Sequence, residues 1–233
     1  FSPRLGFNWD VFKNQKTQVR GGIGVFAGPP PFVWISNQAS NNGVQFGSFS
    51  KTNVAFSPDI NAYRPSATAE NTAYNLVFTD KDFKYPQALK ASFAVDQKLP
   101  GNVVATLEYT FSKDIDAVYF QNVNLPSTGK AFGGSDGRIR YDSTKIYGGK
   151  PVATVTNPNI SNAILMTNAN EGYGYTLTLQ LQKTMRNFYF SAAYTYSEVK
   201  TLNDGGSIAA SNWRDRPVKG DPNATDLGYA NFY

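Results

Sequence analysis

The side chains of this chain that could do chemistry are carboxylates, amides and aromatic rings, because its 233 residues include no histidine and no cysteine. A Ser-His-Asp triad is therefore excluded, as is a thiolate metal site. Aspartates spaced two residues apart, Asp80 with Asp82 and Asp114 with Asp116, could act as a paired acid and base. Asp80, Asp82, Asp136 or Asp204 could ligate calcium together with loop carbonyls. None matches a dedicated calcium loop. We expect no enzyme activity, no metal site and no cofactor.

Polar and aromatic side chains between the strand-like stretches form a second group of candidates. Trp, Tyr, Asn and Arg side chains can bind sugars, peptides or partner proteins, and long loops of ordinary composition are usually functional. The candidate ligand-binding residues are Trp34, Asn37, Tyr141, Trp213 and Arg214. The alternative is that these side chains pack the loops on one another and close the mouth of a barrel.

Charged residues within the strand-like stretches form the third group. Arg4, Arg20, Lys90 and Glu108 all occupy the polar positions of their stretches. In a barrel these positions face the lumen, where charges tune selectivity. They could contact a substrate or a plug, or they could pair with charges on neighbouring strands.

The elements that must position these residues are strands. Residues i and i+2 share one face of a strand, and six stretches place apolar residues at every second position: 4–11, 18–25, 89–96, 103–112, 175–182 and 188–197. The clearest alternation sets Tyr175, Leu177, Leu179 and Leu181 against Thr176, Thr178, Gln180 and Gln182. Residues 227–233 also indicate a strand. Aromatic residues gather near the strand ends, as in the interfacial girdles of membrane barrels.

The connectors between these stretches alternate in length. Three are short, at 12–17, 99–102 and 184–187, and three are long, at 27–84, 113–172 and 198–225. Short turns on one side and long loops on the other are typical of outer-membrane barrels. The predicted fold is therefore all-β: six to seven strands of an antiparallel up-and-down transmembrane β-barrel, with short periplasmic turns and long extracellular loops. A soluble β-sandwich would show the same alternation and is the alternative.

Composition excludes several other classes of protein. No stretch has the ~18 apolar residues of a membrane-spanning helix. Mean hydropathy is −0.39 with 41% hydrophobic residues, which suits strands that are apolar on one face only. The net charge of +5 is spread along the chain without a run of Lys or Arg, so no nucleic-acid partner is expected. Because both ends read as strand, residues 1–233 are expected to be a single segment of a longer barrel domain.

Several segments resemble one family. Residues 1–10 (FSPRLGFNWD), 19–26 (VRGGIGVF), 31–38 (PFVWISNQ), 85–90 (YPQALK) and 212–215 (NWRD) look like the barrel of TonB-dependent receptors. The resemblance is to the Oar-like group, which carries an N-terminal carboxypeptidase-regulatory-like domain. It implies a barrel of about 22 strands occluded by a plug, contact with outer-membrane lipid, an unknown external substrate and energy from the TonB complex. The chain shows no plug, TonB-binding segment or regulatory-like domain.

The resemblance predicts substrate recognition and passage through a gated barrel. Three alternatives stay open on the residues alone: an adhesion or binding barrel, a porin-like channel, and a soluble sandwich that binds glycans.

Overall fold

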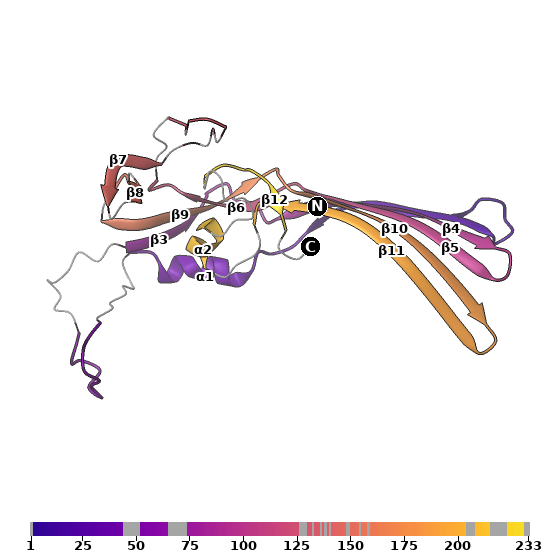
Figure 1. Ribbon diagram of the computed structural model, residues 1–233, viewed down its shortest axis with the longest axis horizontal. Helices are drawn as coiled ribbons and strands as arrows, with labels where there is room; N and C mark the ends of the chain where they lie inside the picture. Colours follow the sequence, from indigo (N-terminus) through magenta and orange to yellow (C-terminus); the bar gives the residue numbers. More distant parts are fainter. Residues whose placement is uncertain are drawn as a thin grey trace.

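A seven-stranded antiparallel sheet dominates the structure (Figure 1). Its strands, in sheet order, are β1 (Arg4–Asp10), β2 (Thr17–Ala27), β4 (Gln87–Leu99), β5 (Val103–Asp114), β10 (Tyr173–Met185), β11 (Phe188–Thr201) and β12 (Gly228–Tyr229). Each strand pairs with the next one along the chain within this sheet, so the predicted up-and-down plan is confirmed. The computed structural model describes residues 2–43, 52–64, 74–125, 130–131, 133–135, 137, 139, 141–147, 150–153, 155–157, 159–203, 208–214 and 223–230.

The period-two pattern of the sequence sets the two faces of this sheet. The register pairs apolar with apolar positions from β1 to β11, for example Leu107 with Leu179 and Leu179 with Tyr194. Many large side chains of this outward face are between 42% and 74% exposed: Leu5, Phe7, Trp9, Ile23, Phe93, Leu107, Tyr109, Leu177, Leu179, Leu181, Phe188, Phe190, Tyr194 and Tyr196. An apolar surface of this extent needs an apolar environment.

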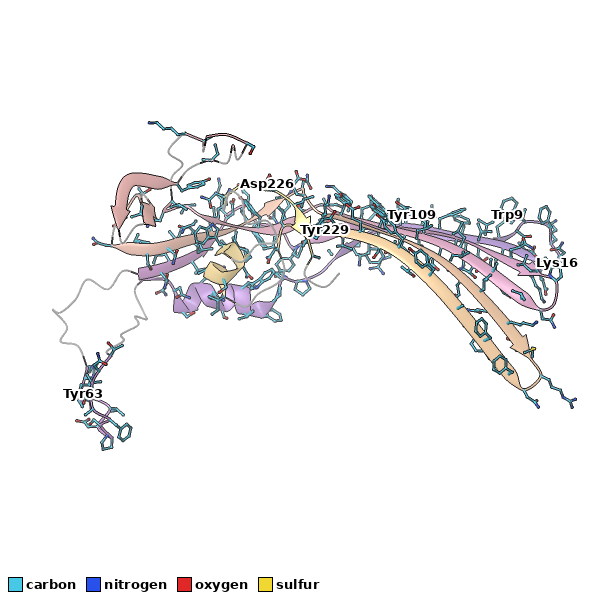
Figure 2. All side chains as sticks on the ribbon, in the orientation of Figure 1. Trp9, Lys16, Tyr63, Tyr109, Asp226 and Tyr229 are labelled. Atoms are coloured by element: carbon cyan, nitrogen blue, oxygen red, sulfur yellow. The ribbon has the colours of Figure 1, made fainter. Side chains whose placement is uncertain are left out.

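The connections sort by length to opposite ends of the sheet (Figure 1). Residues 11–16, 100–102 and 186–187 make the short turns, and residues 28–86, 115–172 and 202–227 make the long connections. Gly101 and Asn102 adopt positive φ angles of 76° and 58°, the left-handed conformation that these residue types tolerate. We call the two ends the turn end and the loop end. Trp9 and Lys16 lie near the turn end, and Tyr229 lies toward the loop end (Figure 2).

The long connections fold into a module of their own, which the sequence analysis did not predict. This loop module contains α1 (Phe32–Ser40) and α2 (Ala209–Arg214) and a three-stranded sheet of β3 (Tyr74–Thr79), β9 (Ile160–Ala169) and β6 (Ala117–Asn122), in that order. β3 pairs with β9 in parallel and β6 with β9 antiparallel. A separate hairpin joins β7 (Asp142–Tyr147) to β8 (Lys150–Ala153).

The buried hydrophobic cluster of the described chain lies in the loop module. It consists of Trp34, Val77, Val118, Phe120, Ile164, Met166 and Ala209, with Phe83, Ala210 and Trp213 packed against it. The rings of Trp34 and Phe120 meet edge to face at 5.4 Å, a favourable aromatic geometry. Because each long connection contributes to this cluster, the three loops stabilise one another. None of the described helices is long and apolar enough to cross a membrane.

Lysines mark the limits of the apolar band on the outward face. Lys113, Tyr173 and Lys200 lie side by side in the register of β5, β10 and β11 at the loop end, and Lys183 faces outward near the turn end of β10. Tyr173 and Lys183 are separated by about 33 Å of strand at 3.3 Å per residue. With a tilt near 45° this spans about 23 Å, close to the ~25 Å apolar band of outer-membrane barrels.

Candidate functional site

The polar face of the sheet carries its charges in transverse rows, each formed by register partners on successive strands. The row nearest the middle, called the salt-bridge row, contains Asn8, Arg20, Ala94, Glu108, Thr178 and Thr195. The row two residues toward the loop end, called the hydroxyl row, contains Gly6, Gly22, Ser92, Thr110, Thr176 and Ser197. The next row, called the cationic row, contains Arg4, Gly24, Lys90, Ser112, Gly174 and Val199.

Arg20 is fully engaged with acidic partners. Its Nε donates to Asp96 Oδ2 at 3.0 Å, and its Nη2 donates to Glu108 Oε2 at 3.1 Å. Thr106 Oγ1 adds a hydrogen bond to the other oxygen of Asp96 at 2.6 Å. The structure therefore joins Arg20 and Glu108 in one network that links β2, β4 and β5. For these two residues this matches the alternative that lumen charges pair with charges on neighbouring strands.

Arg4 and Lys90 lie in a different environment. Within the described chain neither forms an ion pair with a carboxylate. Both cations instead approach the ring of Phe26, Arg4 with its guanidinium carbon 4.4 Å and Lys90 with its ammonium 5.8 Å from the ring centre. A cavity of about 490 Å³ opens over these three side chains and over the hydroxyls of Ser92 and Thr110.

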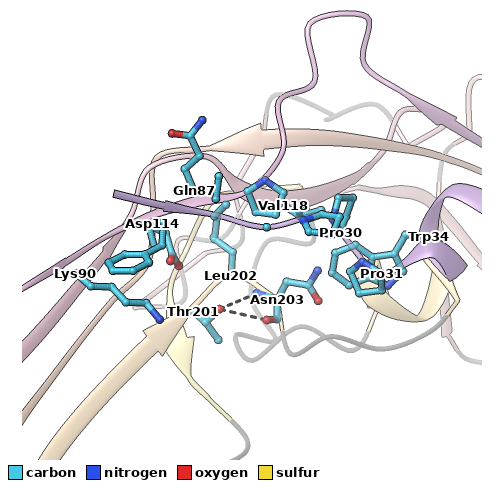
Figure 3. A pocket seen from close by; sticks show the side chains of 17 residues that line it. Pro30, Pro31, Trp34, Gln87, Lys90, Asp114, Val118, Thr201, Leu202 and Asn203 are labelled. Carbon is cyan, nitrogen blue, oxygen red and sulfur yellow. Dashed lines mark hydrogen bonds between the residues drawn. The ribbon is translucent and has the colours of Figure 1, made fainter. Parts of the chain in front are cut away.

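A second cavity, of about 480 Å³, lies where the loop module meets the loop end of the sheet (Figure 3). Lys90 and Asp114 line it from the sheet, and Pro30, Pro31 and Trp34 line it from the loop module. Phe26 and Lys90 also line the first cavity, so these two residues stand at the boundary between the cavities. Two candidates from separate groups of the sequence analysis, Trp34 and Lys90, thus meet at one cavity.

The loop candidates lie mostly inside the module. Trp34 and Asn37 are each 7% exposed, and Asn37 Nδ2 donates to the carbonyl of Val33 at 2.6 Å. Trp213 packs against the core, and its Nε1 donates to Asn223 Oδ1 at 3.1 Å. Tyr141 is half-buried just before β7. Arg214 ends α2, and its side chain lies outside the described part of the chain. A role of these residues in ligand binding stays a prediction.

Asn223 is a residue that the sequence analysis missed. Its side-chain amide accepts from the backbone N–H of Asn122 at 3.0 Å and donates to the backbone carbonyl of the same residue at 3.1 Å. It thereby pairs with the outer edge of β6 much as a neighbouring strand would, and Tyr119 donates its hydroxyl to the Asn223 carbonyl. Nothing in an isolated asparagine signals this role, since its partners lie about a hundred residues away.

Phe26 was also missed, although the sequence carried a signal for it. Phe26 occupies a polar-face position of β2, in the register of Gly22 and Gly24. An aromatic ring at a polar-face position breaks the alternation of the strand. Here the ring lies beneath the cationic groups of Arg4 and Lys90.

Among the described residues, no three acidic side chains gather in a group that could hold a metal ion. Asp80 accepts hydrogen bonds from the Asp82 N–H and from Thr167 Oγ1, both at 3.0 Å, and these bonds lower the pKa of its carboxyl. The side chain of Asp82 faces Lys81 at 3.8 Å in solvent. Asp136 and Asp204 lie outside the described residues.

Comparison with known proteins identifies the family. A family model described as "Outer membrane beta barrel domain" matches residues 1–232. A search of curated proteins found no significant match. One similar solved structure is the siderophore receptor PirA from Pseudomonas aeruginosa, with 13% sequence identity and a TM-score of 0.40 over 85% of this chain. This chain spans 29% of that receptor's length. The family match over nearly every residue shows that the chain belongs to the outer membrane beta barrel domain family and lies in the cell outer membrane.

Proposed function

We propose that this chain forms part of the wall and the outer gate of a TonB-dependent, Oar-like receptor that recognises an external substrate and passes it through its barrel. In this arrangement the outward face contacts lipid, the polar face lines the lumen, and the loop module stands at the extracellular mouth. The observation that carries the proposal is the cavity shared by the loop module and the lumen wall, lined by Trp34 from one side and Lys90 from the other.

Closing the barrel, occluding it and contacting TonB would be the work of other parts of the protein. β1 and β12 are the edges of the described sheet, and an open edge in lipid leaves backbone groups unsatisfied. Further strands would therefore pair with them and close the barrel. A plug and a TonB-binding segment would come from outside this chain. No catalytic role is proposed.

An adhesion or binding barrel is the second candidate function. The hydrophobic cluster around Trp34 and Ile164 gives the loop module a core of its own, so it could present a fixed surface to a partner without any transport. This candidate needs neither a plug nor TonB.

The experiment uses the full-length parent protein, purified from outer membranes in detergent. One arm measures capture of the protein by the immobilised periplasmic domain of TonB, with an unrelated outer-membrane porin as the control. The other arm measures conductance after insertion into planar bilayers. TonB capture together with a closed barrel supports the proposal. Steady conductance without capture would instead indicate a porin, and the absence of both would indicate the adhesion barrel.

A further inference from the structure

The charges of the lumen wall are sorted by height. Arg20 of the salt-bridge row forms ion pairs with Glu108 of the same row and with Asp96, which lies one row toward the turn end. The hydroxyl row above the salt-bridge row carries only glycine, serine and threonine. The cationic row carries Arg4 and Lys90 without an acidic residue. Going from the middle of the wall toward the extracellular mouth, the wall therefore changes from ion-paired charges to two positive charges that form no ion pair among the described residues.

A glycine separates Arg4 from Lys90 on the lumen wall. Gly24 lies between Arg4 and Lys90 in the register, and a Cβ on it would come within 2.9 Å of Arg4 Cγ. The absence of a side chain leaves room for both cations over the ring of Phe26. Their backbones are two strand spacings apart, about 10 Å. Two like charges held this close repel one another, and an anion between them removes that repulsion.

The surroundings of the cations suit an anion with several oxygens. Arg4 offers a planar fork of N–H donors and Lys90 a flexible ammonium. Ser92, Thr110 and Ser112 line the same cavity with hydroxyls. Its volume of about 490 Å³ is that of a small-molecule site. The acid nearest to Lys90 toward the mouth is Asp114, one row beyond it. Asp114 is half-buried and interacts electrostatically with Lys90, although the two form no ion pair among the described contacts.

We propose that Arg4 and Lys90, set on either side of Gly24 beneath the extracellular mouth, bind an anionic oxygen group of the substrate, a carboxylate or a phosphate. This inference rests on the proposed function for the direction from which the substrate arrives. It adds the substrate's chemical class, which is a small anion or a molecule with an anionic group.

The test is equilibrium binding to the full-length parent protein in a nonionic detergent at low ionic strength. Citrate is the carboxylate probe, inorganic phosphate is the phosphate probe, and spermidine is the cationic control, each followed by titration calorimetry. The test variants carry Arg4→Gln and Lys90→Gln, singly and together. The matched control is Lys98→Gln, which removes the same charge from the same face of β4 but beside Asp96 at the turn end. A heat-modifiable band on a gel verifies that every variant is folded.

We expect citrate or phosphate to bind the unaltered protein, and spermidine not to bind. Each cation removed should raise the dissociation constant about tenfold, as for a charge-assisted hydrogen bond. Lys98→Gln should change it less than twofold. Whichever anion binds more tightly identifies the carboxylate or the phosphate form of the site.

Two results would overturn the inference: no binding of either anion to the unaltered protein, or equal losses in the test and control variants. The first would mean that acidic groups elsewhere in the parent protein already occupy the cations. This test needs no energy source, so its outcome is independent of TonB capture. Anion binding without TonB capture would support the anion site and contradict the proposed transport function. TonB capture without anion binding would support transport and contradict the anion site.

Discussion

The sharpest test of the membrane orientation of the sheet is a lysine placed at neighbouring positions of β10. Leu179 is at the centre of β10, points outward and is 50% exposed. Gln180 is the next residue and points to the lumen wall, where its Nε2 donates to Ser191 Oγ at 3.2 Å. The variants Leu179→Lys and Gln180→Lys therefore add the same charge to the same strand, on opposite faces.

The expected magnitude follows from the depth of Leu179. The outward lysines of the loop end lie in the row of Tyr173, which is about 20 Å along the strand from Leu179. With a tilt near 45° this is about 14 Å of depth, roughly half of a ~25 Å apolar band. Lysine near the midplane costs about 2–4 kcal/mol, a factor of about 30 to 700 in the folding equilibrium.

For Gln180→Lys we expect a change within about 0.5 kcal/mol, as for an ordinary surface substitution. The lost hydrogen bond to Ser191 joins two exposed side chains, so its loss costs little.

The assay is guanidinium unfolding and refolding of the full-length parent protein in phospholipid vesicles, read from the fraction of heat-modifiable band. Leu177→Lys and Leu181→Lys would complete the outward series, with costs below that of Leu179→Lys. The reasoning is refuted if Gln180→Lys is as costly as Leu179→Lys, or if Leu179→Lys costs less than about 0.5 kcal/mol. The outward face would then contact water or another protein layer.

Three further predictions concern the loop module and its attachment. Asn223→Ala should destabilise the loop module by about 1–3 kcal/mol, since it leaves the buried backbone of Asn122 without its hydrogen-bond partner. Hydrogen exchange should become faster at the Asn122 amide and stay unchanged in β10. Gly172→Ala should be destabilising because Gly172 has φ +117° and a Cβ there would clash with Asp114 Oδ2. Thermal unfolding should show that adding Asp114→Ala recovers only part of the lost stability, and full recovery would contradict the role of φ. Because the pKa of Asp80 is lowered, the ionised carboxylate stabilises the module fully above the ordinary pKa of 3.8, and this stabilisation is lost as pH falls through the lowered pKa. Limited proteolysis of the loops from pH 5 to pH 2 should show an acid-dependent step that Asp80→Asn removes.

Much of the barrel segment could be predicted from the sequence because its signals are local. Alternation in a stretch such as 175–182 fixes which side chains share a face, whatever the partner strands are. The three short turns and three long connections then fix the order of neighbouring strands, since antiparallel neighbours in an up-and-down sheet follow one another in the chain. Arg4, Arg20, Lys90 and Glu108 consequently lie on one face, as their positions in the pattern indicated.

The differences among these four charges were not readable from the sequence. Each occupies an equivalent position in its own strand, but the register across strands sets Arg20 beside Asp96 and Glu108 and sets Arg4 and Lys90 around Gly24. Register depends on turn geometry and on the pairing of whole strands, so a single strand does not reveal which charges meet.

The sequence by itself determined the strand faces, the membrane-type sorting of turns and loops, and the polar character of the lumen wall, since these depend on residues a few positions apart. Only the tertiary structure decided that the long connections fold together around Trp34, Phe120 and Ile164, and that Asn223 pairs with the edge of β6. It also decided that Lys90 shares one cavity with Trp34 and another with Arg4. Those contacts join segments many tens of residues apart, so they depend on how the whole chain packs and not on any local pattern.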